Sequence, residues 1–115
     1  DGEGENLFVV APDGTQTHDR PVWHARMFAP GMGIVEDPAT GAAACAFAGL
    51  LAVELPDGNH RALIRQGVAM GRPSTLELGM AIEGGSLKAA ALGGHSVIVG
   101  EGVMETELAE PGALT

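Results

Sequence analysis

The segment from Ala42 to Leu55, AAACAFAGLLAVEL, constrains the fold more than any other part of the sequence. It consists mainly of good helix formers, carries no charge before Glu54 and is followed by a Pro-Asp-Gly turn, so it is predicted to be a helix. Its apolar residues run around all sides, and such a helix is normally buried on all sides. In a chain of 115 residues, this pattern predicts a sheet wrapped around one central helix.

Glycine turns separate the remaining apolar segments, which are predicted to be strands. Eighteen glycines and an aromatic content of 3% indicate tight turns and a core of small aliphatic and Met side chains. Gly84-Gly85 is typical of a two-residue hairpin. Residues 1–115 are therefore expected to form a single α+β domain, a mixed, mostly antiparallel β-sheet or barrel around one central buried helix. Strands are predicted over 6–11, 22–28, 60–66, 74–82, 86–92, 95–99 and, as a short last strand, 104–108, with a loop over 14–19 and a frayed tail over 110–115.

Charge and composition exclude several classes of function. A net charge of −9 argues against nucleic acid and against anionic membrane surfaces, which both require basic patches. No apolar run approaches the ~20 residues of a membrane span, and the first residues lack the basic region of a signal peptide. The single cysteine, Cys45, excludes an internal disulfide and favours a reduced, cytoplasmic setting. No metal site is expected, because the histidines do not fall at ligand spacing: His18, His24, His60 and His95.

Residues 36–43, EDPATGAA, lead into the predicted helix and are the best candidate for chemistry. The free amides at a helix start, together with the positive end of the helix dipole, bind anions such as a substrate carboxylate. Gly41 and Ala42 would leave those amides sterically open. The spacing alone also permits a simple capped helix, with Asp37 as N-cap before a proline at the first helical position, or with Thr40 as N-cap.

Three stretches, in this order, resemble the phenazine-biosynthesis (PhzF-like) isomerase family. They extend over most of the chain, from about residue 22 to residue 104. The most specific is the one around Asp37, and the other two would be weak alone. The stretches are RMFAP at 26–30 followed by EDPATGAA at 36–43, QG at 66–67 with MGRPS at 70–74, and VIVGEG at 97–102.

This resemblance implies a diaminopimelate-epimerase-like fold, in which two similar domains enclose the active site between them. It also implies an isomerase without cofactor or metal that shifts protons on a small carboxylate-bearing metabolite; in the family's namesake this is a dihydro-hydroxyanthranilate of phenazine synthesis. Asp37 matches the active-site aspartate, expected to bind a substrate amine or hydroxyl and to set local protonation. Thr40, Gly41 and Ala42 are expected to bind substrate, the last two through their backbone amides. Ala42 replaces the usual Ser of the motif, so a hydroxyl contact is lost.

The resemblance covers only the C-terminal half of such a protein. The family's catalytic glutamate and a glycine-histidine element belong to the N-terminal domain, and no glutamate of this chain lies in a matching motif. We therefore expect a part of a longer isomerase that is inactive alone, with an N-terminal sister domain or a second copy of the chain as partner. The alternatives are a non-catalytic domain that binds a small carboxylate or self-associates, and a thiol-based epimerase relative. Cys45, one turn into the helix, is expected to be a core residue rather than a nucleophile.

The arginines have mainly structural interpretations. Arg26, on a predicted strand, is expected to pair with an acid such as Glu36. Arg72, just before Pro73, is expected to order a turn, although an arginine that faces a cleft can also pair with a carboxylate. The Gly-x-Gly stretches at 31–33 and 100–102 lack the strand–turn–helix context of a nucleotide site.

Overall fold

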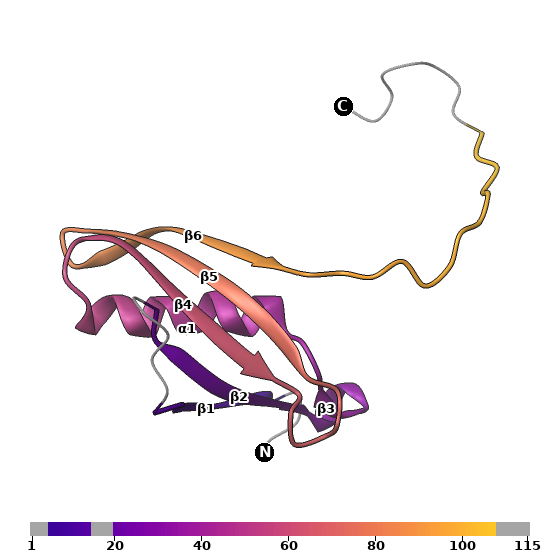
Figure 1. The fold of residues 1–115 in the computed structure, drawn as a ribbon, viewed down its shortest axis with the longest axis horizontal. Coiled ribbons are helices and arrows are strands. Elements are labelled where there is room, and N and C mark those ends of the chain that lie inside the picture. Colours follow the sequence, from indigo (N-terminus) through magenta and orange to yellow (C-terminus); the bar gives the residue numbers. More distant parts are fainter. Residues whose placement is uncertain (1–4, 15–19, 108–115) are drawn as a thin grey trace.

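The computed structural model describes residues 5–14 and 20–107, which form one sheet packed on one α-helix (Figure 1). The loop predicted over 14–19 and the tail over 110–115 therefore lie almost wholly outside the described residues. The elements in chain order are β1 (Leu7–Pro12), β2 (Val22–Ala29), the 3-10 helix η1 (Pro30–Met32), β3 (Ile34–Asp37), α1 (Gly41–Glu54), β4 (Gly58–Gln66), β5 (Ser74–Glu83) and β6 (Ser86–Gly94).

The sheet has the strand order β1-β2-β4-β5-β6, and β3 pairs with β2 beside this path. Its pairs are antiparallel except for β2 and β4, which run parallel. A parallel pair requires a long crossover between its strands, and β3 and α1 supply it here. This mixed, mostly antiparallel sheet with a single helix confirms the predicted fold class. Among the described residues, no helix has the length and apolar character needed to cross a membrane.

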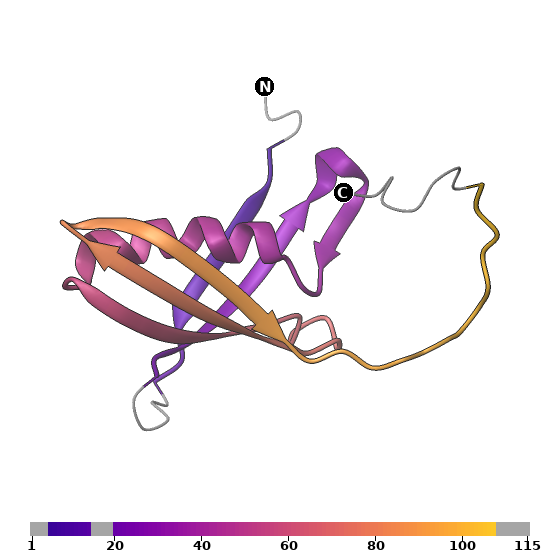
Figure 2. The same cartoon turned by 90° about the horizontal axis from the view of Figure 1, so that it is seen from above.

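The core lies between α1 and the sheet, which curves along one side of the helix (Figure 2). The alanines of α1 let the helix come close to the strands, and Phe47 fills the remaining space with its ring edge-to-face against Trp23, 5.1 Å between centroids. Burial of each large aliphatic side chain stabilises the fold by about 1.5–3 kcal/mol. The buried residues of α1 recur at helical spacing: Ala44, Phe47, Ala48, Leu51 and Ala52.

The opposite face of α1 is exposed, so the prediction of a helix buried on every side is wrong for this chain. Leu50 is 70% exposed and Val53 78%, although both are apolar. The sheet covers only one side, because β1 and β6 end it at two separate edges and do not meet around the helix. The apolar composition of α1 predicts that this face packs against other residues, but it does not show whether those residues belong to the same chain.

Two predicted strands are also wrong. Residues 95–107 form no strand and run away from the sheet as extended chain (Figure 1), while residue 108 lies outside the described residues. Val99, for example, is 93% exposed. The apolar pattern suits a strand, but a strand forms only where a neighbouring edge supplies hydrogen-bond partners.

The remaining differences are local. Strand β3 was not predicted, because four residues after a Pro-Gly-Met-Gly break are too few to show a period of two. The helix begins and ends one residue earlier than predicted, and β4 and β6 each extend two residues further.

Asp57 ties the end of α1 to the β5–β6 hairpin. Its carboxylate accepts hydrogen bonds from the amides of Gly84, at 2.8 Å, and Gly85, at 3.0 Å. Both glycines have positive φ, 62° and 75°, which confirms the predicted two-residue turn. The hydrogen bond from Gly85, followed by that from Gly84, lowers the pKa of Asp57.

Replacing Asp57 with Ala removes both hydrogen bonds, so we expect a lower free energy of unfolding at neutral pH. Because folding lowers this pKa from its ordinary value of 3.8, the stabilising effect is present above that value. It is lost as the pH falls through the lower pKa of the folded protein. Urea unfolding of both proteins over a pH series measures the difference, with the exposed Glu101→Ala as control. A difference that persists in strongly acidic solution would contradict this role.

Candidate functional site

The segment between β3 and α1 forms one wall of a cavity of about 460 Å³. Asp37 comes from the end of β3, while Thr40, Ala42 and Ala43 come from the start of α1. Among the lining residues, Asp37 is the one with a carboxyl side chain. The cavity is otherwise mainly apolar, and its other lining residues are Asn6, Phe8, Met27, Ala29, Met32 and Ile34.

The helix start leaves its first amides without acceptors. Thr40 has the extended backbone of an N-cap residue, and the first helical hydrogen bond runs from the amide of Ala44 to the carbonyl oxygen of Thr40, at 3.1 Å. The Thr40 hydroxyl does not cap the helix; it donates to Oδ2 of Asp37 at 2.5 Å. Within the described chain, the amides of residues 41–43 therefore have no hydrogen-bond acceptor.

These bonds decide between the two capping schemes that the spacing permitted. Asp37 is not the N-cap, because α1 begins at Gly41 rather than at Pro38. Thr40 occupies the N-cap position, but its side chain serves Asp37 instead of the helix. Thr40 therefore has the backbone conformation of an N-cap, but its side chain leaves the first amides of the helix free to donate hydrogen bonds.

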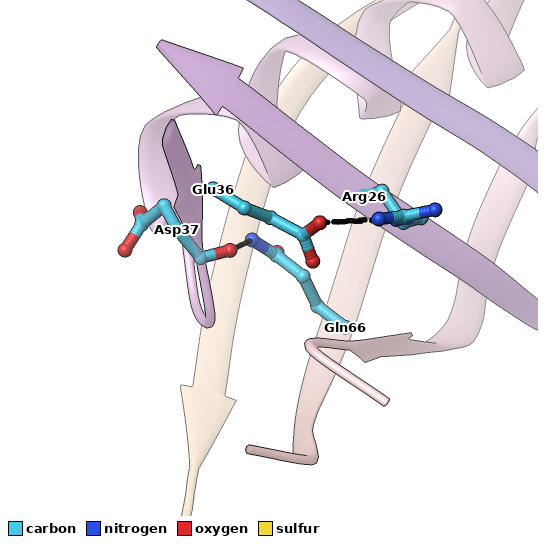
Figure 3. Close-up of polar contacts among 4 residues, drawn as sticks. All are labelled: Arg26, Glu36, Asp37 and Gln66. Carbon is cyan, nitrogen blue, oxygen red and sulfur yellow. Dashed lines mark hydrogen bonds and ion pairs between the residues drawn. The ribbon is translucent and has the colours of Figure 1, made fainter. Parts of the chain in front are cut away.

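Gln66, at the end of β4, holds the segment in place from below the site (Figure 3). Its side chain is 0% exposed. Its Nε2 donates to the carbonyl oxygen of Asp37 at 2.8 Å and to Oγ1 of Thr40 at 2.9 Å. Its Oε1 accepts from the amide of Thr40 at 3.2 Å. All the polar atoms of this buried amide are therefore paired, as burial requires.

The turn after β4 packs on the same segment. Ser74 donates its hydroxyl to the carbonyl oxygen of Pro38 at 2.7 Å. Gly67, with φ of 79°, lies so close that a Cβ there would collide with the carbonyl oxygen of Arg72 and lie 3.0 Å from that of Pro38. We call Gln66, Gly67 and Ser74 the loop cradle, since all three contact the loop of residues 37–40.

The cradle residues lie in stretches that resemble the family, but no role was predicted for them. One indication was present in the pattern of β4. Ala62 and Ile64 face the core, so Gln66, two residues further, must also face inward. A polar side chain at a core-facing position needs buried hydrogen-bond partners. Gln66 finds them in the loop of residues 37–40.

The predicted ion pair between Arg26 and Glu36 is confirmed. Nη2 and Nε of Arg26 lie 2.6 Å and 3.1 Å from Oε1 of Glu36, and the guanidinium lies 5.0 Å from the ring centroid of Phe28. The Glu36 side chain is only 8% exposed and points to Arg26, while the carboxylate of Asp37 points the other way (Figure 3). Glu36 thus supports the start of the loop and does not line the cavity.

Other candidate residues lie outside the cavity wall. The Cβ position of Gly41 points to Leu92 of β6, 2.9 Å from its Cδ2, so the missing side chain makes room for β6. Cys45 is half-buried rather than fully buried, and it does not line the cavity. Arg72 is exposed, and its amide closes the turn to Gly67 at 2.9 Å, which agrees with a turn-ordering role. Among the described residues, no group of His, Cys, Asp and Glu is arranged to hold a metal ion.

Comparison with known proteins identifies the family. A sequence model described as phenazine biosynthesis-like protein matches residues 4–102. The chain belongs to this family. It is 48% identical over 82 residues to an uncharacterised isomerase of Mesorhizobium japonicum, and 45% identical over 102 residues to one of Deinococcus radiodurans, which covers 70% and 85% of the chain.

A third relative carries a specific name. The trans-2,3-dihydro-3-hydroxyanthranilate isomerase of Pseudomonas aeruginosa is 38% identical over 87 residues, or 70% of the chain. The matched regions make up 27%, 32% and 29% of the three relatives in turn. The chain therefore spans less than a third of the length of these relatives.

The close approach of the cradle to the loop can be tested at Gly67. We expect Gly67→Ala to lower the free energy of unfolding by more than Gly71→Ala. Both glycines have φ of 79°, so both substitutions carry the left-handed strain of about 1–2 kcal/mol. Only position 67 adds a collision with the backbone, since nothing lies within 4 Å of a Cβ at position 71. Urea unfolding of the two variants gives the comparison, and equal losses would contradict the close approach.

Proposed function

We propose that this chain forms one wall of the active site of an isomerase that moves a proton on a small carboxylate-bearing metabolite. The observation that carries the proposal is that Asp37 and the first turn of α1, with its unpaired amides, line the same cavity. A helix N-terminus attracts a carboxylate, and an aspartate beside it can bind a polar group or hold a proton at the reacting end. Membership of a family whose relatives are named isomerases supports this class of reaction.

In this proposal, three parts of the cavity bind three different parts of the substrate. The amide of Ala42, which lines the cavity, and the adjacent amide of Gly41 bind its carboxylate, aided by the positive end of the helix dipole. The apolar wall, with Phe8, Met27 and Ile34, accommodates its carbon frame. Asp37 binds an amine or hydroxyl of the substrate and sets its protonation. No step of this scheme draws on a metal or a cofactor.

The second acid/base group comes from outside this chain in our proposal. A proton shift needs at least one acid/base group that removes the proton and returns it, and the cavity wall of this chain offers Asp37 alone among the described residues. The resemblance implies that the partner group is a glutamate of an N-terminal sister domain. The length of the relatives, more than three times the matched regions, is consistent with such a domain.

This division of labour predicts that the 115-residue chain alone has no isomerase turnover, whereas the longer protein that contains it does. Trans-2,3-dihydro-3-hydroxyanthranilate, named for the Pseudomonas relative, is the first substrate to assay. In the longer protein, Asp37→Asn is expected to lower kcat about 10²- to 10⁴-fold. Asp57→Asn, at the far end of α1, is the control and is expected to leave kcat unchanged. Turnover by the isolated chain, or full activity of Asp37→Asn, would overturn the proposal.

A non-catalytic carboxylate-binding domain is the second candidate. It is favoured by Ala42, which lacks a side-chain hydroxyl, and by the presence of one carboxyl group among the described residues of the cavity wall. The intact mass of the native protein separates the two. A mass two to three times that of this chain supports the isomerase, and a mass equal to it supports the free-standing domain.

The exposed apolar face of α1 is the proposed contact for a sister domain, or for a second copy when the chain is alone. Contiguous exposed apolar surface of this kind commonly marks an interface. We expect the isolated chain to self-associate, and Leu50→Glu to weaken the association. Val68→Glu is the control, because Val68 is also exposed but lies in the turn after β4. Sedimentation velocity over a concentration series measures both, and a wild-type chain that stays monomeric at high concentration would contradict the prediction.

A further inference from the structure

We propose that Gln66 is a positioning residue for Asp37: it fixes the direction of the Thr40 hydroxyl and so leaves one oxygen of Asp37 available to the cavity. The inference rests on the proposed function, in which Asp37 meets the substrate. It assigns a role to a residue that lies outside the cavity wall and is fully buried behind it.

The orientation of the Gln66 amide follows from its partners. Nε2 lies near a carbonyl oxygen, that of Asp37, and Oε1 lies near an amide nitrogen, that of Thr40. Turning the amide over would place oxygen against oxygen and N–H against N–H, so one orientation alone satisfies both neighbours. The second hydrogen of Nε2 is then directed at Oγ1 of Thr40, 2.9 Å away.

This second hydrogen bond determines what the Thr40 hydroxyl does. Since Oγ1 accepts from Gln66, its own hydrogen is directed to another acceptor, and Oδ2 of Asp37 lies 2.5 Å away. The chain of donors therefore runs in one direction, from Gln66 to Thr40 to Asp37. Oδ2 is held as an acceptor, while Oδ1 has no hydrogen-bond partner in the part of the chain that the structure describes. Oδ1 is thus the oxygen left for a substrate group.

The same amide also sets the start of α1. Gln66 binds the backbone of both Asp37 and Thr40, the residues on either side of the turn into the helix. Because Gln66 is excluded from water, no solvent molecule can replace these bonds without a rearrangement of the core. One side chain thereby fixes the carboxylate of Asp37 relative to the amides of residues 41–43.

Ser74 provides a matched comparison. Its hydroxyl donates to the carbonyl oxygen of Pro38 in the loop at 2.7 Å and lies 3.3 Å from the carbonyl oxygen of Gln66, and among the described residues no hydrogen bond joins it to Thr40 or to the Asp37 side chain. A purely structural role for Gln66 predicts that loss of either residue loosens the loop in the same way. A positioning role predicts that only Gln66 controls the side-chain rotamers of Thr40 and Asp37.

The test compares Gln66→Met with Ser74→Ala in the 115-residue chain, by NMR three-bond couplings that report χ1 of Thr40 and Asp37. We expect single rotamers for both residues in the wild type and in Ser74→Ala, and averaged rotamers in Gln66→Met. Fixed rotamers in Gln66→Met would overturn the proposal. Should that variant fail to fold, Thr40→Val removes the same relay without changing the core, and a fixed Asp37 rotamer there would equally overturn it.

Kinetics of the longer protein separate this inference from the proposed function. We expect Gln66→Met and Thr40→Val each to lower kcat about 10- to 100-fold with little change in KM, since misplacement by about 1 Å has effects of this size. The double variant is expected to lose no more than the single ones, because both act through one chain of hydrogen bonds. Loss of activity in Asp37→Asn but not in Gln66→Met would overturn the positioning role of Gln66 and leave the proposed function standing. Full activity of Asp37→Asn would overturn the function itself.

Discussion

The buried amide of Gln66 is the interaction on which the rest of the site depends. Its position on the core-facing side of β4 removes it from water, so it must find partners inside the protein. It finds them in the loop between β3 and α1, which is joined to it across 26 to 29 residues of sequence. Gly67 and Ser74 bring the following turn against the same loop. The end of a central strand, the end of β3 and the start of the helix are thus held as one unit.

This arrangement separates the two requirements of the proposed chemistry. The donors for a carboxylate come from the backbone at the start of α1, which no side chain of the described chain occupies. The polar group for the reacting end comes from Asp37, whose Oδ2 accepts from Thr40 while its Oδ1 has no hydrogen-bond partner among the described residues. Arg26 holds the Glu36 side chain away from that of Asp37, so these two adjacent acids do not compete for one position (Figure 3).

One face of α1 packs against the sheet, and the opposite apolar face is left exposed. α1 is apolar all round, yet the sheet reaches only the side that carries Phe47 and Leu51. Leu50 and Val53 remain exposed, as does the extended segment around Val99. Exposed apolar surface is reduced by association. The site lies at the start of this same helix, and Leu50 and Val53 lie toward its end.

Features that depend on neighbours along the chain could be predicted from the residues alone. Periodicity and turn chemistry predict helix α1, the Gly84-Gly85 hairpin and all strands except β3. The loop with Asp37 and Thr40 was recognisable as a motif. Four other features depend on contacts between distant segments: the direction of the Thr40 hydroxyl, the hydrogen bonds of Gln66, the close approach of Leu92 to Gly41 and the exposed face of α1. The predicted strand over 95–99 failed for the same reason as the predicted burial of α1. A strand needs hydrogen-bond partners and an apolar helix face needs packing partners, and both come from residues distant in sequence or from other chains. A local sequence pattern shows that such partners are needed but does not show which residues supply them.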